Sequence, residues 1–280
     1  MMRLPPRRIL VAADFSRSSL PAVAAARLLA GHFHAPLEAV YCEAPIASEL
    51  YDGPLPEDPE LLRRTAQRLG QTVTKELLLH AVHGEPAPSI ARVARARKAD
   101  LIVVGTHGRR GVMRAVLGSV AEDLVHQAPA PVLVVRRRMR LPERILAPLG
   151  ADAEAAQGLL AAALLARSLR ARLDVVHAAP SGGGGDAERL MAARLNALPA
   201  ALRRAARVTG QIVSGKPLEA ILKAARGRDL LVLLARPKSL LGDLVLGTTA
   251  ERVVRYCPIP VLALSPRKRS LKGGGGDGRT

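Results

Sequence analysis

Aromatic residues are scarce in this chain. They make up 2% of its 280 residues, and tryptophan is absent. Proteins that bind single-stranded nucleic acid stack the bases on aromatic side chains, and this chain has few to offer. Its net charge of +18 includes basic runs such as Arg136-Arg137-Arg138, which could pair with phosphates. No helix-turn-helix or zinc-finger spacing accompanies those runs, so the sequence argues against specific nucleic-acid binding.

Cysteines and long apolar runs are also lacking. The two cysteines, Cys42 and Cys257, lie far apart in the sequence, which excludes a disulfide framework and a zinc site of ordinary spacing. No apolar run approaches the roughly 18 residues that a membrane helix needs. The basic start of the chain is not followed by the apolar segment of a signal peptide. We therefore expect a soluble, cytoplasmic protein without a membrane partner.

An internal repeat is the main feature that the chain does contain. Residues 1–140 and 141–280 carry the same order of apolar runs, and the best match joins 129–135 to 258–264. The offset between matching positions falls from 136 near the start to 129 near the end. The length differences therefore lie between the strands, where insertions are tolerated.

The repeat predicts two homologous domains, at 1–140 and 141–268. The glycine-rich segment 269–280 has no apolar residue to anchor it, so we expect a disordered tail. Two Pro- or Gly-rich segments, 48–59 and 181–186, follow the second strand of each domain and indicate mobile loops or lids.

Short apolar runs alternate with helical patterns in both halves. The run Leu101 to Val104 is continuously apolar, as a strand buried on both faces of a parallel sheet requires. After each such run, apolar residues recur at helical spacing. One example is Leu20 to Gly31, where Ser18 or Ser19 would cap the helix and Pro21 lies in its first turn. This alternation predicts an α/β fold of two tandem five-stranded parallel sheets with helices on both faces, Rossmann-like in layout.

A glycine-rich loop separates one of these strands from the next helix. Gly105-Thr106-His107-Gly108 follows the run that ends at Val104, and after nine intervening residues Gly118-Ser119 opens a helix. Glycines permit close approach to the main chain, and a helix N-terminus attracts phosphate oxygens. Arg109 adds a charge for the same anion, while Ser119 and Glu122 have the capping-box spacing. Each piece alone could be structural, but together they favour nucleotide binding.

This pattern, Gly-x2-Gly-x9-Gly-Ser, resembles that of the universal stress protein family, as do the opening strand 9–14 with Phe15-Ser16 and the closing strand 131–135. The chain is similar to the tandem-domain members, over both halves. The resemblance implies an adenine-nucleotide hydrolase-like fold and a bound ATP, with or without Mg²⁺. The positions that would hold the nucleotide are Ala12, Ala13, Asp14, Cys42, Gly105, Thr106, His107, Gly108, Gly118, Ser119 and Val120.

The placement of three of these residues supports the assignment independently. Asp14, Cys42 and Gly105 each end or follow a predicted strand. Ligands of open α/β sheets bind outside the carboxyl ends of the strands, where the strand order reverses. The alternative for Asp14 is an Asx-type cap on the turn that follows it.

The second half has lost most of this motif. Its residues at the aligned positions are Leu234 for Gly105, Pro237 for Gly108 and Gly150 for Asp14, and only Gly247-Thr248 is retained. Leucine and proline restrict approach to the main chain, and proline lacks an N–H donor. We predict that this half does not bind ATP as the first does, and that it has a structural or regulatory role.

The functional hypothesis is a stress-response protein regulated by ATP in its N-terminal domain. Any ATP hydrolysis would be slow, because the sequence offers no dedicated base and no clear acidic pair for Mg²⁺. One alternative is a scaffold that binds no nucleotide and acts through protein contacts, and another is a nucleotide-using enzyme such as a transferase or ligase. In each case the apolar final strands could pair at their edges, within the chain or in a homodimer.

Overall fold

The computed structural model describes residues 5–14, 19–43, 77–106, 117–152, 154–180, 184–235, 237–238, 245–246 and 248–264. The predicted lid at 48–59, the predicted tail at 269–280 and the loop residues His107, Gly108 and Arg109 lie outside these ranges.

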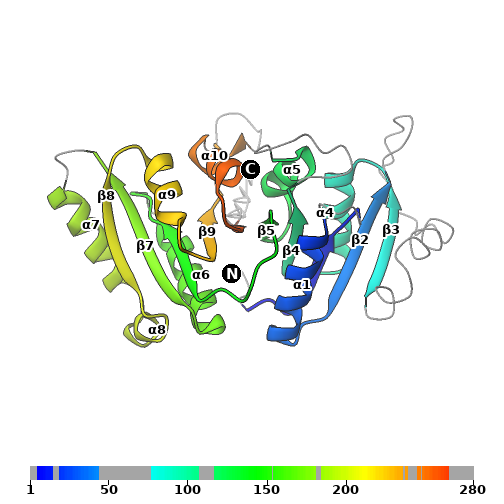
Figure 1. The fold of residues 1–280 in the computed structure, drawn as a ribbon, viewed down its shortest axis with the longest axis horizontal. Coiled ribbons are helices and arrows are strands. Elements are labelled where there is room, and N and C mark those ends of the chain that lie inside the picture. Colours follow the sequence, from blue (N-terminus) through cyan, green and yellow to red (C-terminus); the bar gives the residue numbers. More distant parts are fainter. Residues whose placement is uncertain are drawn as a thin grey trace, which may run out of the picture.

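In the described part of the chain, ten strands form one sheet, to which each half contributes five parallel strands (Figure 1). The order across the sheet is β3-β2-β1-β4-β5 and then β12-β9-β6-β7-β8. The predicted α/β fold with two parallel five-stranded units is confirmed, and the two units are joined into one sheet. The strands of the N-terminal half are β1 (Ile9–Ala12), β2 (Leu37–Glu43), β3 (Leu78–His83), β4 (Leu101–Gly105) and β5 (Val132–Val135). Those of the C-terminal half are β6 (Arg144–Pro148), β7 (Arg172–Ala179), β8 (Thr209–Ser214), β9 (Leu230–Leu234) and β12 (Val261–Leu264), while β10 (Pro237–Lys238) and β11 (Val245–Leu246) form a separate antiparallel pair.

Helices cover both faces of the sheet. Successive side chains of each buried strand point to opposite faces, and they are apolar on both faces. In β1, Ile9 and Val11 face one core, and Leu10 and Ala12 face the other. The first core is covered by α1 (Leu20–Phe33), α6 (Ala155–Leu169), α7 (Gly184–Asn196) and α8 (Ala200–Ala205). The second is covered by α4 (Pro86–Ala96), α5 (Ser119–Gln127), α9 (Pro217–Ala225) and α10 (Thr248–Tyr256).

The start of α7 corrects one expectation. Residues 181–186 were predicted to form a mobile loop, but Gly184 and Gly185 already lie in the first turn of α7 together with Asp186. An acidic residue in the first turn is favourable at the positive end of the helix dipole. The amphipathic stretch that follows therefore extends the helix back into the glycine-rich segment.

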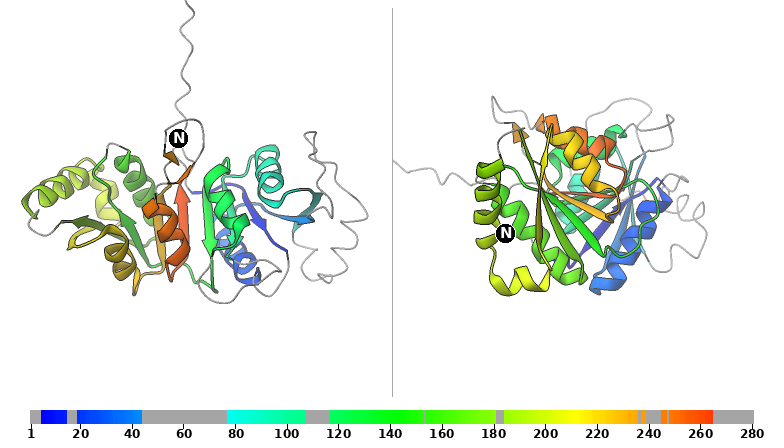
Figure 2. Two further views of the ribbon diagram at one scale, coloured as in Figure 1. Left: turned by 90° about the horizontal axis from the view of Figure 1, so that it is seen from above. Right: turned by 60° about the vertical axis from the view of Figure 1, so that its left-hand side comes forward.

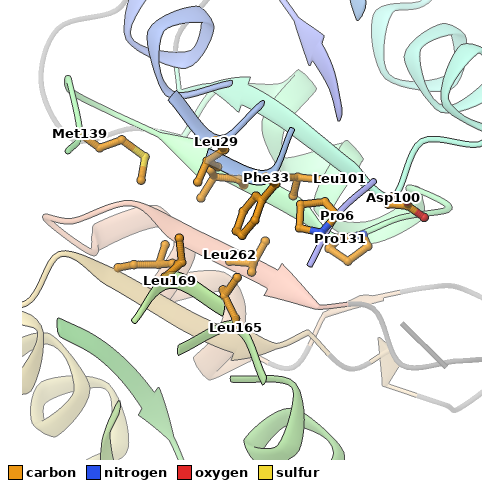
Figure 3. A pocket seen from close by; sticks show the side chains of 12 residues that line it. Pro6, Leu29, Phe33, Asp100, Leu101, Pro131, Met139, Leu165, Leu169 and Leu262 are labelled. Carbon is orange, nitrogen blue, oxygen red and sulfur yellow. The ribbon is translucent and has the colours of Figure 1, made fainter. Parts of the chain in front are cut away.

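The two halves meet at the centre of the sheet through antiparallel pairing of β5 with β12 (Figure 2). Leu133 pairs with Leu262, and both side chains are buried. Next to them, α1 and α6 enclose an apolar cavity that Leu29 and Phe33 of α1 line opposite Leu165 of α6 (Figure 3). At about 20 Å³ it is little larger than the space that one water molecule needs, so we interpret it as a packing gap between the halves.

Polar contacts join the halves on the opposite face. Arg255 of α10 donates to both carboxylate oxygens of Glu122 on α5, at 2.8 and 3.0 Å, and to Glu251 on its own helix. Arg136, directly after β5, donates to the carbonyl oxygens of Val254 and Arg255. The last turn of α10 is therefore attached to the N-terminal half.

Each half also buries one carboxylate at the amino-terminal edge of its strands. Glu38 of β2 has a side chain only 7% exposed; it accepts hydrogen bonds from Arg97 Nε at 2.7 Å and from His80 Nε2 at 2.8 Å. Burial raises the pKa of Glu38, but the hydrogen bonds from Arg97 and His80 outweigh it, and the net pKa lies below the ordinary value of 4.5. Glu38 therefore stabilises the fold while it is ionised.

The hydrogen bonds to Glu38 predict that the destabilisation caused by Glu38→Gln depends on pH. In the unfolded chain Glu38 binds a proton near pH 4.5, whereas in the fold it does so only at lower pH. Its contribution to the free energy of unfolding is complete above the unfolded-state pKa of 4.5 and is lost as the pH falls through the folded-state pKa. Urea unfolding should show a gap between wild type and Glu38→Gln that narrows below pH 4.5. The exposed Glu188→Gln should show no such trend, and a Glu38→Gln gap that stays constant from about pH 7 to 3 would contradict the prediction.

Candidate functional site

Three strand ends of the N-terminal half converge where the strand order reverses. β1 lies between β2 and β4, with Ala12 in register with Val40 on one side and Val104 on the other. Adjacent strands lie about 4.8 Å apart, so the residues that follow them are neighbours. Ala13 continues the β1 ladder through an N–H bond to the Val40 carbonyl at 3.0 Å. The partly buried Asp14 follows it directly.

The glycine-rich motif begins and ends at this same edge. Gly105, the last residue of β4, is in register with Val135, and the next residue, Thr106, is only 3% exposed. The Gly118 N–H donates to the Thr106 carbonyl at 2.7 Å. This bond brings the two ends of the motif together, although the loop residues between them lie outside the described ranges.

The start of α5 differs from the capping-box prediction. Gly118 is the N-cap residue, Ser119 is the first helical residue, and no side-chain cap bond is present. Glu122 contacts Arg255 of the other half instead of reaching back to the start of its helix. The first N–H groups of a helix lack intrahelical partners, and among the described residues no side chain caps those of Ser119 and Val120. They remain suited to an anion.

Cys42 lies beside Asp14's strand, on β2. Its thiol donates to the Gly84 carbonyl at 3.3 Å. Burial raises the pKa of Cys42 to about 11, against smaller opposing effects from Ser89 and Arg92. The thiol is therefore neutral and serves as a small apolar wall, without the reactivity of a thiolate.

Gly84 also belongs to this wall, although it lies outside the glycine-rich motif. It has a φ of +132°, and a Cβ placed there would lie 2.8 Å from the buried Ser89 hydroxyl. A glycine is therefore needed at this position. The recurring pair Gly84-Glu85-Pro86 and Gly215-Lys216-Pro217 could have indicated it, since Gly215 has a φ of +124°.

The C-terminal half repeats the backbone of the site but not its side chains. The Leu149 N–H donates to Val176 at 2.8 Å, as Ala13 does to Val40, and Gly150 stands where Asp14 would be. The side chain of Leu234, at the position of Gly105, packs against α6 so closely that a Cβ on Gly158 would lie 3.2 Å from it. At the end of β9, the Leu234 side chain therefore occupies space that Gly105 leaves open at the end of β4.

The profile of the Universal stress protein family matches the chain twice, over residues 5–136 and 142–265. The chain belongs to the universal stress protein family. A universal stress protein from Methanocaldococcus jannaschii is 34% identical over 140 residues, which cover 47% of this chain and 82% of the relative. One from Mycobacterium bovis is 26% identical over 208 residues, covering 66% of this chain and 70% of the relative.

Solved structures agree on the fold of this universal stress protein. A universal stress protein from Archaeoglobus fulgidus superposes with a TM-score of 0.68 at 16% identity, over 94% of this chain and 99% of that one. Likeness at this level of identity concerns the fold, and the superposition extends across both halves.

Among the described residues no three His, Cys, Asp or Glu side chains gather closely enough to hold a metal ion. Within those same ranges, no helix has the length and apolar character that crossing a bilayer would take.

Proposed function

We propose that this universal stress protein binds ATP in its N-terminal half and acts as a cytoplasmic, nucleotide-regulated stress protein. The observation that carries the proposal is the convergence of Asp14, Thr106 and the start of α5 at one sheet edge. A carboxylate there can accept hydrogen bonds from ribose hydroxyls or an adenine amino group. The helix N-terminus supplies the amides and positive dipole end that phosphate groups require.

The chemistry of the described residues fits an adenine nucleotide. The neutral Cys42 thiol and the main chain at Gly84 provide an apolar wall beside the carboxylate. Phosphates would lie toward Ser119 and Val120, and the loop residues His107, Gly108 and Arg109 are proposed to close over them.

The C-terminal half is proposed not to bind ATP in this manner. Gly150 offers no carboxylate in the place of Asp14, and Leu234 adds a side chain where Gly105 has none. The proposed role of this half is to support the N-terminal one through the β5 to β12 pairing.

Isothermal titration of the full chain with ATP tests the proposal. We expect saturable binding with a Kd below 1 mM (−4.1 kcal/mol). Asp14→Asn should weaken it by at least about tenfold, or 1.4 kcal/mol. Asparagine retains an Asx-type cap, so the loss would report the ligand contact and not the turn.

Asp123→Ala, which removes an exposed carboxylate on α5, is the matched control and should bind as wild type does. A folded wild-type protein with no affinity for ATP or ADP would refute the proposal and favour a scaffold. Equal affinities of Asp14→Asn and wild type would refute the role of Asp14.

A further inference from the structure

A second cluster of charge lies in the C-terminal half, at the amino-terminal edge of its strands and away from the edge discussed above. Its centre is Asp174, a buried residue near the start of β7. Arg144 begins β6, Arg172 begins β7, and Arg228 precedes β9. Because these strands are parallel neighbours, their starts meet around the Asp174 carboxylate.

The hydrogen-bonding capacity of Asp174 is fully used. Its Oδ2 accepts from Arg144 Nη2 at 2.9 Å and from Arg228 Nε at 3.0 Å. Its Oδ1 accepts from Thr209 Oγ1 at 3.0 Å and lies 3.2 Å from Arg172 Nε. A carboxylate has about four lone-pair sites, so Asp174 can accept nothing more.

The three arginines keep donors that Asp174 does not use. Each guanidinium has five N–H groups. Arg172 contacts Asp174 through Nε at 3.2 Å, and Arg228 also donates from Nη1 to the Arg226 carbonyl at 3.4 Å. The side chains of Arg144 and Arg172 are 47% and 50% exposed, so ligands in solution can reach them. Three positive charges surround one negative charge, which leaves a local surplus.

Other charged groups at this edge leave the net charge positive, because Asp229 and Glu143 add two negative charges and Arg170 and Arg207 add two positive ones. The Asp229 carboxylate already accepts the backbone N–H groups of Glu143 and Arg144, at 3.0 and 2.8 Å. The Glu143 side chain is exposed. Arg170 and Arg207, each two residues upstream of a strand start, add further positive charge.

The N-terminal half shows that a buried acid here needs only one arginine. Glu38 stands at the position of Asp174, and its side-chain partners are Arg97 and His80. Arg8, the counterpart of Arg144, donates to the Arg97 carbonyl instead of the acid. Pro36 occupies the position of Arg172. The additional guanidinium groups are therefore specific to the C-terminal half, and neutralising the acid does not require them.

We propose that Arg144, Arg172 and Arg228 form an anion site for a chain of two or more phosphates. Guanidinium forks match phosphate oxygens in geometry and charge, and Asp174 holds the three forks in place. Such a ligand is either a free oligophosphate or the phosphate tail of a nucleotide. The site lies in the half that lacks the ATP-binding motif, so it does not depend on the function proposed above.

Calorimetric titration with sodium tripolyphosphate tests the site in the full-length protein. We expect saturable binding that weakens with added salt. Arg172→Gln should lower the affinity about three- to tenfold, as expected for the loss of one charge-assisted contact. Arg144→Gln combined with Arg172→Gln should lower it further. Arg189→Gln, on the exposed surface of α7 with a side chain 81% exposed, is the control of equal charge change.

A second titration, of ATP into Asp14→Asn with and without Arg172→Gln, separates the two sources of phosphate, because only the binding that Arg172→Gln weakens belongs to this site. Affinity equal to that of tripolyphosphate would identify the phosphate chain as the group bound, and higher affinity would identify a nucleotide. Absence of saturable tripolyphosphate binding would overturn the proposal. So would an Arg172→Gln affinity equal to that of Arg189→Gln, with urea midpoints showing that both variants are folded.

Discussion

Leu262→Asp is expected to lower the free energy of unfolding by more than about 4 kcal/mol, because a carboxylate at this position would be buried without a partner. Leu262 is only 4% exposed and pairs with Leu133 where β12 meets β5. The substitution thus acts on the strand pairing that joins the two half-sheets. Urea unfolding followed by circular dichroism measures the effect.

Leu20→Asp is the matched control, since Leu20 is the first residue of α1 and is 53% exposed. Its cost should stay within about 0.5 kcal/mol. If Leu262→Asp does not fold, Leu262→Ala should still fold and lose about 2 to 5 kcal/mol. Wild-type stability in both Leu262 variants would show that the central pairing does not hold the halves together.

The fold could be predicted from the sequence where local pattern and tertiary environment agree. The continuous apolar run at 101–104 became β4, and the helical spacing after Ser19 became α1, with Pro21 in its first turn. Every residue of β4 is buried in the structure, and α1 buries the apolar residues of one face. The pairing of β5 with β12 could not be assigned in the same way, because the apolar edges alone left open pairing within the chain or between two chains.

The sequence was misleading where a polar residue finds its partner in the other half. Ser119 and Glu122 have the spacing of a capping box, but Glu122 pairs with Arg255, which is 133 residues away. Gly118 takes the capping position because its extended backbone, with a φ of −68° and a ψ of 147°, precedes the helix. A local pattern carries no information about such distant competition.

The candidate site was predictable to the extent that it consists of strand ends. Asp14 and Gly105 follow strands that could be recognised from their apolar runs, and neighbouring parallel strands bring such residues together. Gly84 could not be recognised from the glycine motif, because its positive φ and the proximity of Ser89 depend on how α4 packs on β2.

The run Arg136-Arg137-Arg138, which the sequence alone offered as a partner for phosphates, contains one structural residue. Arg136 is half-buried, and its guanidinium donates to the carbonyl oxygens of Val254, at 2.9 Å, and Arg255. These carbonyls belong to the last turn of α10, where helix bonding leaves them without partners and the dipole is negative. Burial lowers the pKa of Arg136, but an arginine in a protein keeps its charge.

Arg136→Ala should therefore lower the free energy of unfolding by about 2 to 3 kcal/mol, the range for charged hydrogen bonds whose buried acceptors lose their donor. Arg136→Met retains the apolar stem, so it should recover only the packing share of that loss. The adjacent, exposed Arg137→Ala removes the same charge and should change stability by less than about 0.5 kcal/mol. Urea unfolding of the three variants at one ionic strength decides between the two interpretations of the run. Equal losses for Arg136→Ala and Arg137→Ala would mean that the run acts through its net charge, whereas a loss confined to position 136 would show that this guanidinium fastens α10 to the N-terminal half.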